Sequence, residues 1–385
     1  MRVMSVVGAR PNFMKMAPVV RALKRSAGVE SLLVHTGQHY DEELSEVFFR
    51  QLGMPEPDAS LAVGSGTHAE QTGRLLTALE RSCIELGPDL VLVGGDVNST
   101  MAAALAAAKL KIPVGHVEAG LRSFDRSMPE EVNRVVADHL SELLFTTEES
   151  GSRNLRREGV AEERIFFVGN CMVDTLLEHI EHALAQEPWS ERQLDPGGYL
   201  LATLHRPANV DDPTVLRGLV DALNEASRML PVVLPLHPRT RKRLEEGAIS
   251  MSRGVRLEPP LPYLSFLGLM ARARCVLTDS GGIQEETTAL GVPCLTLRRN
   301  TERPITVELG TNKVIGNEPD QIVEALQEAL ADERKAGSQL PPLWDGKAGV
   351  RVAEIVAEWG GQNRTIGTKV SGRFPNHRHA FPRHL

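Results

Sequence analysis

Short apolar runs that end in Gly, Ser, Asp or His alternate with amphipathic stretches along most of this chain. Runs such as LVLVGG at Leu90–Gly95 are apolar throughout, which is typical of a strand covered on both faces in a parallel sheet. Strands that alternate with helices need right-handed crossovers and form open, doubly wound sheets. The alternation therefore predicts an α/β fold.

The alternation occurs in two sets. In the first half, the predicted strands are Arg2–Gly8, Ser31–Gly37, Asp89–Gly95, Pro113–Gly120, Leu143–Thr147 and Arg164–Gly169. The predicted helices between them are Lys15–Arg25, Ala69–Leu86, Met101–Leu110, Glu130–Leu140 and Ser150–Glu158. The second set of strands comprises Tyr199–His205, Val232–His237, Val255–Glu258, Cys275–Thr278, Cys294–Leu297 and Lys313–Gly316, with helices at Thr214–Arg228 and Gly282–Leu290.

A polar segment with Pro and Gly, Glu187–Gly198, follows a predicted helix at Val173–Gln186 and marks the connection between the two sets. We predict two Rossmann-like domains, at residues 1–172 and 173–348, whose strand ends face a shared cleft. Ligands of such sheets bind at the carboxyl ends of the strands. Residues 361–385 carry five Arg or Lys and three His but no acid, so we predict a mobile basic tail there.

Charge and cysteine content exclude several classes of protein. The net charge of −7 argues against a nucleic-acid binder with a broad basic surface. The four cysteines lie far apart without ligand-like spacing, which favours reduced thiols in a cytoplasmic protein. The interrupted apolar run at the N-terminus does not resemble a signal peptide, and no apolar stretch approaches the ~18 residues of a membrane span.

Polar residues gather where the first-half strands end. The turn GARPNFMK at Gly8–Lys15 directs Arg10 and Lys15 over the sheet, although it is not a Walker A loop. Asp96 follows the strand at Asp89–Gly95, and Glu118 lies on the next strand, two residues after His116. These positions predict a polar site at the carboxyl edge of the first sheet.

Glu130 and Arg134 open the next helix, in the segment MPEEVNR. Helix capping by Asp96 and a first-turn dipole role for Glu130 are the structural alternatives. Convergence of Asp96, Glu118 and Glu130 instead favours proton transfer to and from carbon, and we expect crowding to raise the pKa values of these carboxyl groups. A metal held by His116 and Glu118 is a weaker alternative, because no third ligand follows at a recognisable spacing.

In the second half, two strand ends carry His and Arg together, in LHRPANVD (His205, Arg206) and LPLHPR (His237). These residues predict that the second domain binds an anion on the side that faces the cleft. The segment TDSGGIQEETTALG places Ser280, Gly281 and Gly282 at a helix start, where small residues let a phosphate approach bare amides. Glu286, about one turn further on, suits ribose hydroxyls. A nucleoside diphosphate site is therefore predicted, with a plain capping turn as the alternative.

The motifs GARPNFMKMAP, HTGQHYD, GGDVNST, HVEAGLR, PEEVNR, TLHRPANVD, HPR, DSGGIQEETTALGVPCLTLR and TERPITVELGTN occur in this order. Together they resemble the non-hydrolysing UDP-N-acetylglucosamine 2-epimerases, over nearly all of residues 2–358. The resemblance implies a fold like that of the two-domain GT-B glycosyltransferases, with a helix at 349–360 returning to the N-terminal domain. It also implies interconversion of UDP-GlcNAc and UDP-ManNAc without metal or redox cofactor, by elimination of UDP to a 2-acetamidoglucal and re-addition.

The resemblance also assigns residues. It implies acid/base roles for Asp96, Glu118 and Glu130, and a catalytic role for His205. Substrate-binding positions matched by the family motifs are Arg10, Lys15, Arg134, Arg206, His237, Ser280, Gly281, Gly282, Glu286 and Arg303. Some bacterial members are activated by a second substrate molecule, which makes Gln38, His39 and Arg74 candidate activator contacts. A homodimer is also expected.

Three rival functions remain open at this point. A GT-B glycosyltransferase would share the DSGG half of the site but has no evident use for three clustered acids in its first domain. A hydrolysing epimerase would release UDP and free ManNAc. A binding module would have no need of all four of Asp96, Glu118, Glu130 and His205. The substrate is also open, because a UDP-sugar modified at C3 or C6, such as a diacetamido-uronate, would fit the same core.

Overall fold

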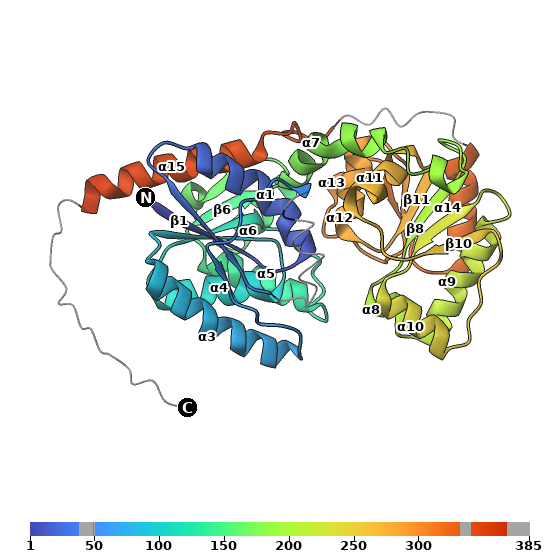
Figure 1. Cartoon of the computed structure of the whole chain (residues 1–385), viewed down its shortest axis with the longest axis horizontal. Coiled ribbons are helices and arrows are strands. Elements are labelled where there is room, and N and C mark those ends of the chain that lie inside the picture. Colours follow the sequence, from blue (N-terminus) through green and yellow to red (C-terminus); the bar gives the residue numbers. More distant parts are fainter. Residues whose placement is uncertain (38–48, 50, 332–339, 368–385) are drawn as a thin grey trace.

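The computed structural model describes residues 1–37, 49, 51–331 and 340–367 and consists of two lobes joined side by side (Figure 1). The first lobe contains β1 (Arg2–Val7), α1 (Arg10–Arg25), β2 (Glu30–His35), β3 (Ala59–Ser60), α3 (His68–Leu86), β4 (Leu90–Gly94), α4 (Asn98–Lys109), β5 (Val114–Ala119), α5 (Pro129–Leu140), β6 (Leu143–Thr146), α6 (Glu149–Arg157) and β7 (Ile165–Phe167). Helix α7 (Cys171–Ala185) leads to the second lobe.

The second lobe contains β8 (Leu200–Thr203), α8 (Pro207–Val210), α9 (Pro213–Ala226), β9 (Val232–Pro235), α10 (Pro238–Glu246), β10 (Val255–Glu258), α11 (Tyr263–Arg272), β11 (Cys275–Thr278), α12 (Gly281–Leu290), β12 (Cys294–Thr296), α13 (Ile305–Glu308), β13 (Asn312–Val314) and α14 (Pro319–Ala331). The chain then returns to the first lobe as α15 (Ala348–Gly367). Two 3₁₀ turns, Glu162–Arg164 and Ser190–Arg192, complete the described elements.

Both sheets are parallel, and both are doubly wound. The first has the strand order β3-β2-β1-β4-β5-β6-β7 and the second β10-β9-β8-β11-β12-β13. Every described ladder is parallel. The strand order therefore reverses between β1 and β4 and again between β8 and β11, and ligands of open α/β sheets bind at such reversals. The predicted α/β fold class is confirmed.

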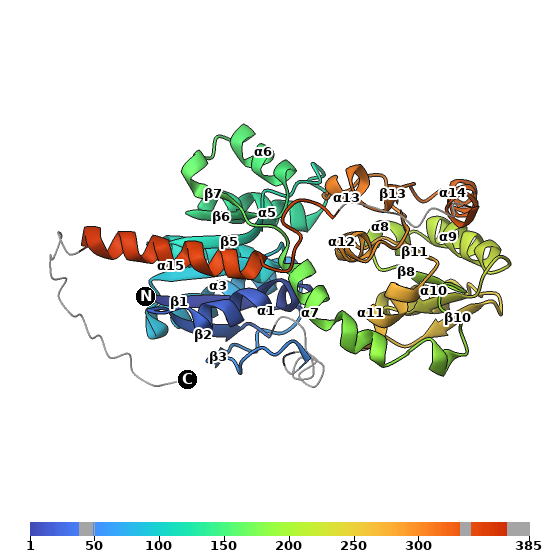
Figure 2. The same cartoon turned by 90° about the horizontal axis from the view of Figure 1, so that it is seen from above.

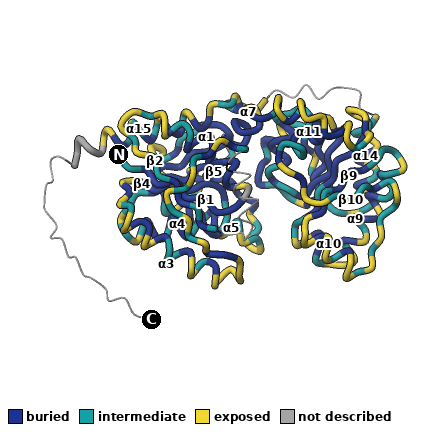
Figure 3. Tube along the Cα trace, in the orientation of Figure 1, coloured by how far each residue is buried: buried dark blue, intermediate teal, exposed yellow. Residues whose placement is uncertain are grey.

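The central position of strand β4 in the sheet explains why its sequence is apolar throughout. Successive side chains of a strand point to opposite faces. Leu90 and Leu92 enter the apolar cluster that contains α1, whereas Val91 and Val93 enter a second cluster built on α3 and α4. The sheet is thus buried between two helical layers, and buried backbone runs through the middle of both lobes (Figure 3).

Helices α7 and α15 tie the two lobes together. Helix α7 packs on α1 of the first lobe and on α11 of the second, and the Thr175 hydroxyl donates to the carbonyl of Met14 at 2.7 Å. Helix α15 lies along α1 (Figure 2), and its Gly349 amide donates to Asp174 of α7 at 2.7 Å. Helix α15 continues past residue 360, the predicted end of this helix, and residues 368–385 lie outside the described part.

The structure also shows the state of the cysteines, the apolar content of the helices and the grouping of possible metal ligands. All four cysteines are buried free thiols. Within the described ranges, none of the helices combines the length and the apolar content that crossing a bilayer requires. Within the same ranges, no three His, Cys, Asp or Glu side chains are grouped as metal ligands.

Candidate active site

The predicted residues of the first lobe lie at the strand-order reversal of its sheet. Lys15 is in the first turns of α1 after β1, Asp96 follows β4, and Glu118 lies at the end of β5. In the second lobe, His205 and Arg206 follow β8, and the DSGG segment follows β11, again at the reversal. The carboxyl edges of both sheets therefore carry the polar groups, as the general rule for such folds requires.

Three ion pairs join these edges across the lobes, one of them between Arg134 of α5 and Glu302 at 3.8 Å. Arg303 Nη2 donates to Glu118 Oε1 at 2.7 Å, and Arg206 Nη1 lies 3.4 Å from Glu130 Oε1. Glu118 and Glu130 belong to the first lobe, and Arg206 and Arg303 belong to the second. The facing edges thus form one site between the lobes.

Glu118 has an unusual backbone. Its φ is +73°, and the β5–β6 register shifts between Val117 and Ala119, as at a β-bulge. Its side chain is buried, pairing with Arg303 through Oε1 and with the Lys15 ammonium through Oε2. Left-handed conformations of non-glycine residues concentrate at functional sites, where surrounding contacts hold them. Two buried cations hold this carboxylate.

Asp96 accepts a forked pair of hydrogen bonds from Arg134. Its Oδ2 lies 3.1 Å from Nε and 2.6 Å from Nη2. Burial alone would raise the pKa of Asp96, but the charges of Arg134, Lys15 and Arg303 outweigh burial and hold that pKa well below its usual range. The expectation that crowding raises the pKa is therefore wrong for Asp96, because each nearby carboxylate is accompanied by a cation.

Glu130 and its neighbour Glu131 have different roles. Glu130 is partly exposed and points to Arg206. Glu131 is buried and accepts from the amides of Ser123 and Phe124, both at 2.9 Å, and from Arg134 at 2.8 Å. Glu131 therefore fixes the loop before α5, which leaves Glu130 as the carboxylate of this pair that faces the site.

Glu302 is a central residue of the site that the sequence reasoning missed. It lies 2.6 Å from Arg303 and 2.8 Å from Arg298, with Arg134 and Arg206 both at 3.8 Å. Burial would raise its pKa, but Arg303, Arg298 and Arg134 hold that pKa well below its usual range. The neighbouring residue in the TERP motif, Arg303, was predicted. The partners of Glu302 come from three separate segments of the chain, so no local sequence pattern indicates the importance of Glu302.

His205 is held by Asp279, a second missed residue. The ring Nδ1 lies 2.9 Å from Asp279 Oδ1, and the amides of His205 and Arg206 donate to the same carboxylate at 3.0 and 2.9 Å. Burial would raise the pKa of Asp279, but the bond from His205 and the His205 charge lower it. The sequence did contain a clue to Asp279, because this residue begins the DSGG segment.

We predict that Asp279→Asn lowers the turnover of the enzyme roughly 10²-fold, because the amide loses the charge that orients His205. Steady-state kinetics with UDP-GlcNAc, the substrate that the sequence resemblance implies, would measure kcat and KM. Asp211→Asn is a matched control, since Asp211 pairs with Arg239 in the same lobe without contacting His205. Equal kinetics in the two variants would contradict the role of Asp279.

The start of α12 lacks a side-chain cap from its N-cap residue, Ser280. A Cβ at Gly281 would lie 2.5 Å from Arg303 Nη1 and 2.6 Å from Glu302 Oε1, so only glycine lets these side chains pack against the helix start. Further along α12, buried Glu286 accepts from Tyr263 at 3.3 Å.

The remaining predicted residues lie at the edges of the site or outside the description. His237 caps α10, its Nδ1 accepting from the Arg239 amide at 3.2 Å, and its ring centroid is 6.0 Å from that of His205. Arg10 begins α1, but its side chain lies outside the described part, as do Gln38 and His39. Arg74 is exposed on α3 and donates to Ser65 O at 2.7 Å.

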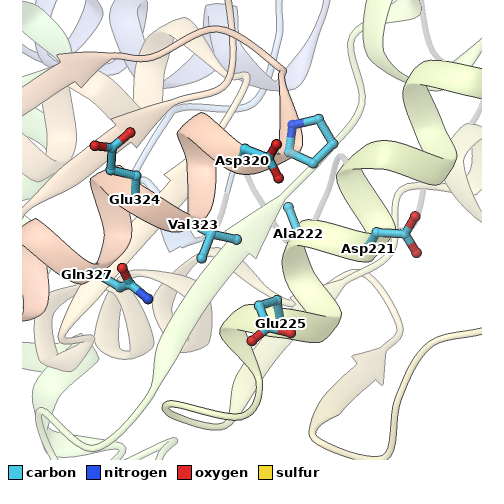
Figure 4. Close-up of a pocket in the computed structure, with 8 residues that line it drawn as sticks. Asp221, Ala222, Glu225, Asp320, Val323, Glu324 and Gln327 are labelled. Atoms are coloured by element: carbon cyan, nitrogen blue, oxygen red, sulfur yellow. The ribbon is translucent and has the colours of Figure 1, made fainter.

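A hollow of about 480 Å³ between α9 and α14 contrasts with this site (Figure 4). Four carboxylates line it, from Asp221, Glu225, Asp320 and Glu324. Among the described residues that line it there is no cation, and none of them lies at a strand end. A phosphate would be repelled there.

Comparisons with known proteins agree with one another. The family description "UDP-N-acetylglucosamine 2-epimerase" matches residues 21–357. The UDP-N-acetylglucosamine 2-epimerase of Methanocaldococcus jannaschii is 41% identical over 92% of this chain and 99% of its own length. The UDP-2,3-diacetamido-2,3-dideoxy-D-glucuronate 2-epimerase of Pseudomonas aeruginosa is also 41% identical, over 93% of this chain and all of its own.

A solved structure extends the likeness to three dimensions. The crystal structure of the M. jannaschii UDP-GlcNAc 2-epimerase in complex with UDP-GlcNAc and UDP has a TM-score of 0.87 at 41% identity. The alignment covers 93% of this chain and 100% of that structure.

Proposed function

Because this chain belongs to the UDP-N-acetylglucosamine 2-epimerase family, we propose that it interconverts UDP-N-acetylglucosamine and UDP-N-acetylmannosamine by inversion at C2. The observation that carries the proposal is the 2.7 Å pair between Glu118 and Arg303. It places an acid/base candidate of one lobe beside the anion-handling elements of the other. Proton transfer at C2 and departure of a diphosphate from C1 need those two groups side by side.

The diphosphate binds at the second lobe in this proposal. The amides at the start of α12 and the guanidinium groups of Arg206 and Arg303 supply its positive surroundings. Glu286 accepts from the ribose hydroxyls. His205, held by Asp279 directly before this helix, lies where positive charge stabilises the departing UDP.

Proton transfer takes place at the first lobe. A carboxylate removes the proton from C2, the C1–O bond breaks, and its electron pair leaves with UDP, so that a 2-acetamidoglucal forms. UDP oxygen then adds back to C1 while a carboxylic acid delivers a proton to the opposite face of C2. Asp96 and Glu118, from adjacent strands, and Glu130, from α5, are the proposed acid/base groups.

The cations near Asp96 set the pKa of this carboxyl group in the free enzyme. Arg134, and after it Lys15 and Arg303, lower the pKa of Asp96 against the effect of burial when no substrate is bound. A bound diphosphate neutralises these cations, so the pKa of Asp96 rises toward the range in which a carboxylate both accepts and returns a proton. Substrate binding thereby activates the carboxylate.

Incubation with UDP-GlcNAc alone in D2O tests the proposal. We expect NMR to show deuterium at C2 together with the manno epimer, because re-addition takes its proton from a group that exchanges with solvent. Absence of exchange without an acceptor would contradict the proposal and favour a glycosyltransferase. Free ManNAc with stoichiometric UDP would instead reveal a hydrolysing epimerase.

The sugar is the second question. The P. aeruginosa relative is named for a diacetamido-glucuronate and is as identical to this chain as the M. jannaschii one, so UDP-2,3-diacetamido-2,3-dideoxy-glucuronate is our second candidate substrate. A tenfold or greater preference in kcat/KM for either sugar would decide between them. The cytoplasmic location and the homodimer remain predictions. Light scattering would test the homodimer by measuring the molar mass of the protein in solution.

A further inference from the structure

His116 lies at the centre of β5, two residues before Glu118, and is completely buried. Its Nε2 lies 2.8 Å from the carbonyl oxygen of Gly95, and its Nδ1 lies 2.6 Å from Asp138 Oδ1. Both ring nitrogens lie within hydrogen-bond distance of protein oxygens, so the ring bridges the Gly95 carbonyl and the Asp138 carboxylate. Gly95 directly precedes Asp96, which places one end of this arrangement at the first acid/base candidate.

The other end reaches the segment after Glu118. Asp138, on α5, is also completely buried. Besides His116, it accepts from the Gly120 amide at 3.1 Å and pairs with Arg122 Nη1 at 2.7 Å. Burial would raise the pKa of Asp138, but His116 and Arg122 lower it, so the carboxylate is ionised and binds all three donors.

The two strand ends that the pair joins are conformationally demanding. Gly95, Glu118 and Gly120 have φ values of +68°, +73° and +80°. For a residue with a side chain, the left-handed region is strained, because Cβ crowds the backbone there. Glu118 keeps this conformation only if the backbone on either side is held, and His116 and Asp138 supply buried bonds on both sides of it.

We propose that His116 and Asp138 form a positioning pair, which sets the backbone under Asp96 and Glu118 and thereby aims both carboxylates at the sugar. The inference rests on the proposed epimerase function, since it acts through those two carboxylates. His116 itself does not touch substrate. It does not bind metal either, because both its ring nitrogens are engaged by protein oxygens.

The pair makes a kinetic prediction. His116→Gln keeps one donor but cannot bridge Gly95 and Asp138 together, so kcat should fall about 10²-fold, the cost of a carboxylate misplaced by about 1 Å. KM and the affinity for UDP should change little, because the diphosphate site lies on the other lobe. Asp138→Asn should act in the same way and provides a second variant should His116→Gln fail to fold.

A double-mutant cycle separates positioning from general destabilisation. If His116 acts through these two carboxylates, then adding His116→Gln to the enzyme that carries both Asp96→Asn and Glu118→Gln should lower the remaining rate less than about threefold. An equal loss in both backgrounds would overturn the proposal, as would a raised KM with unchanged kcat. Thermal unfolding would confirm that each variant is folded at the assay temperature.

His179→Gln is the matched control. His179 is also buried, with its ring nitrogens 2.8 Å from Thr175 O and 2.7 Å from Gln51 O, but it lies on α7 away from both strand ends. Its kcat should equal that of the unmodified enzyme, and a comparable loss would count against a specific role of His116. Absence of C2 exchange by the unmodified enzyme would instead overturn the proposed function, and the inference with it.

Discussion

Replacing Asp96 with asparagine is expected to lower kcat for epimerisation by about 10²–10⁴-fold while leaving the affinity for UDP nearly unchanged, and Glu118→Gln is expected to do the same. An amide occupies the same space but cannot take a proton from C2. UDP binding is preserved because its proposed contacts lie on α12 and Arg206 of the second lobe. NMR of the C2 proton and calorimetry with UDP would measure the two effects.

Glu162→Gln is the matched control for these variants. Glu162 pairs with Arg156 on the outer surface of the same lobe, so its loss should leave kcat unchanged. Near-native rates in both Asp96→Asn and Glu118→Gln would remove the two carboxylates from the mechanism. A large loss of UDP affinity would instead show that they act in binding.

Replacing Arg303 with methionine should lower the free energy of unfolding by about 3–5 kcal/mol, because it leaves charged groups buried without their partner. Arg303 is 3% exposed and pairs with Glu118, Glu285 and Glu302, at 2.7, 2.9 and 2.6 Å. Urea denaturation would measure the change. In the control Arg156→Met, an exposed arginine loses its partners Glu149 and Glu162, and little change is expected.

The deficit of Arg303→Met should depend on pH. In the native enzyme, Arg303 lowers the pKa of Asp96 and Glu302. A carboxyl group whose pKa is lower in the folded protein stabilises the fold at any pH above its unfolded pKa of about 4. This stabilisation is lost only as the pH falls through the pKa that the group has in the folded protein. Glu285 behaves differently, because burial already raises its pKa although Arg303 opposes that effect. Without Arg303 the pKa of Glu285 rises further, so this carboxyl group destabilises the fold at neutral pH until it is protonated. The difference between the two proteins should therefore shrink from pH 7 toward pH 4. A constant difference would show that packing, not charge, is lost.

The sequence predicted the sheets because their strands carry a strong pattern. Leu90–Gly94 is apolar on both faces, and each side of it meets a separate helical layer. The two-residue strand β3 (Ala59–Ser60) and the four-residue helix α13 (Ile305–Glu308) were missed. Elements this short contain only about one period of their pattern, so the pattern never repeats, and only contacts with neighbouring segments define them.

The site was predictable wherever a polar residue directly follows a strand. Asp96 and His205 lie just beyond their strands at the reversals of strand order, and Glu118 lies near the end of the neighbouring strand β5. Glu302 was missed because partners such as Arg134 lie far along the chain. Asp279 directly follows β11, but its role depends on the contact with His205 on another strand end. His116 was read as a rival metal ligand, and only its contacts with Gly95 and Asp138 reveal its surroundings.

The return of α15 to the first lobe has a consequence for biosynthesis. Val352 and Val356 of this helix belong to the same apolar cluster as Val19 and Leu23 of α1. A ribosome makes α1 near the beginning and α15 only after the entire second lobe. The apolar face of α1 therefore stays uncovered while the intervening residues are translated, and the lobe that begins first is the last to be completed.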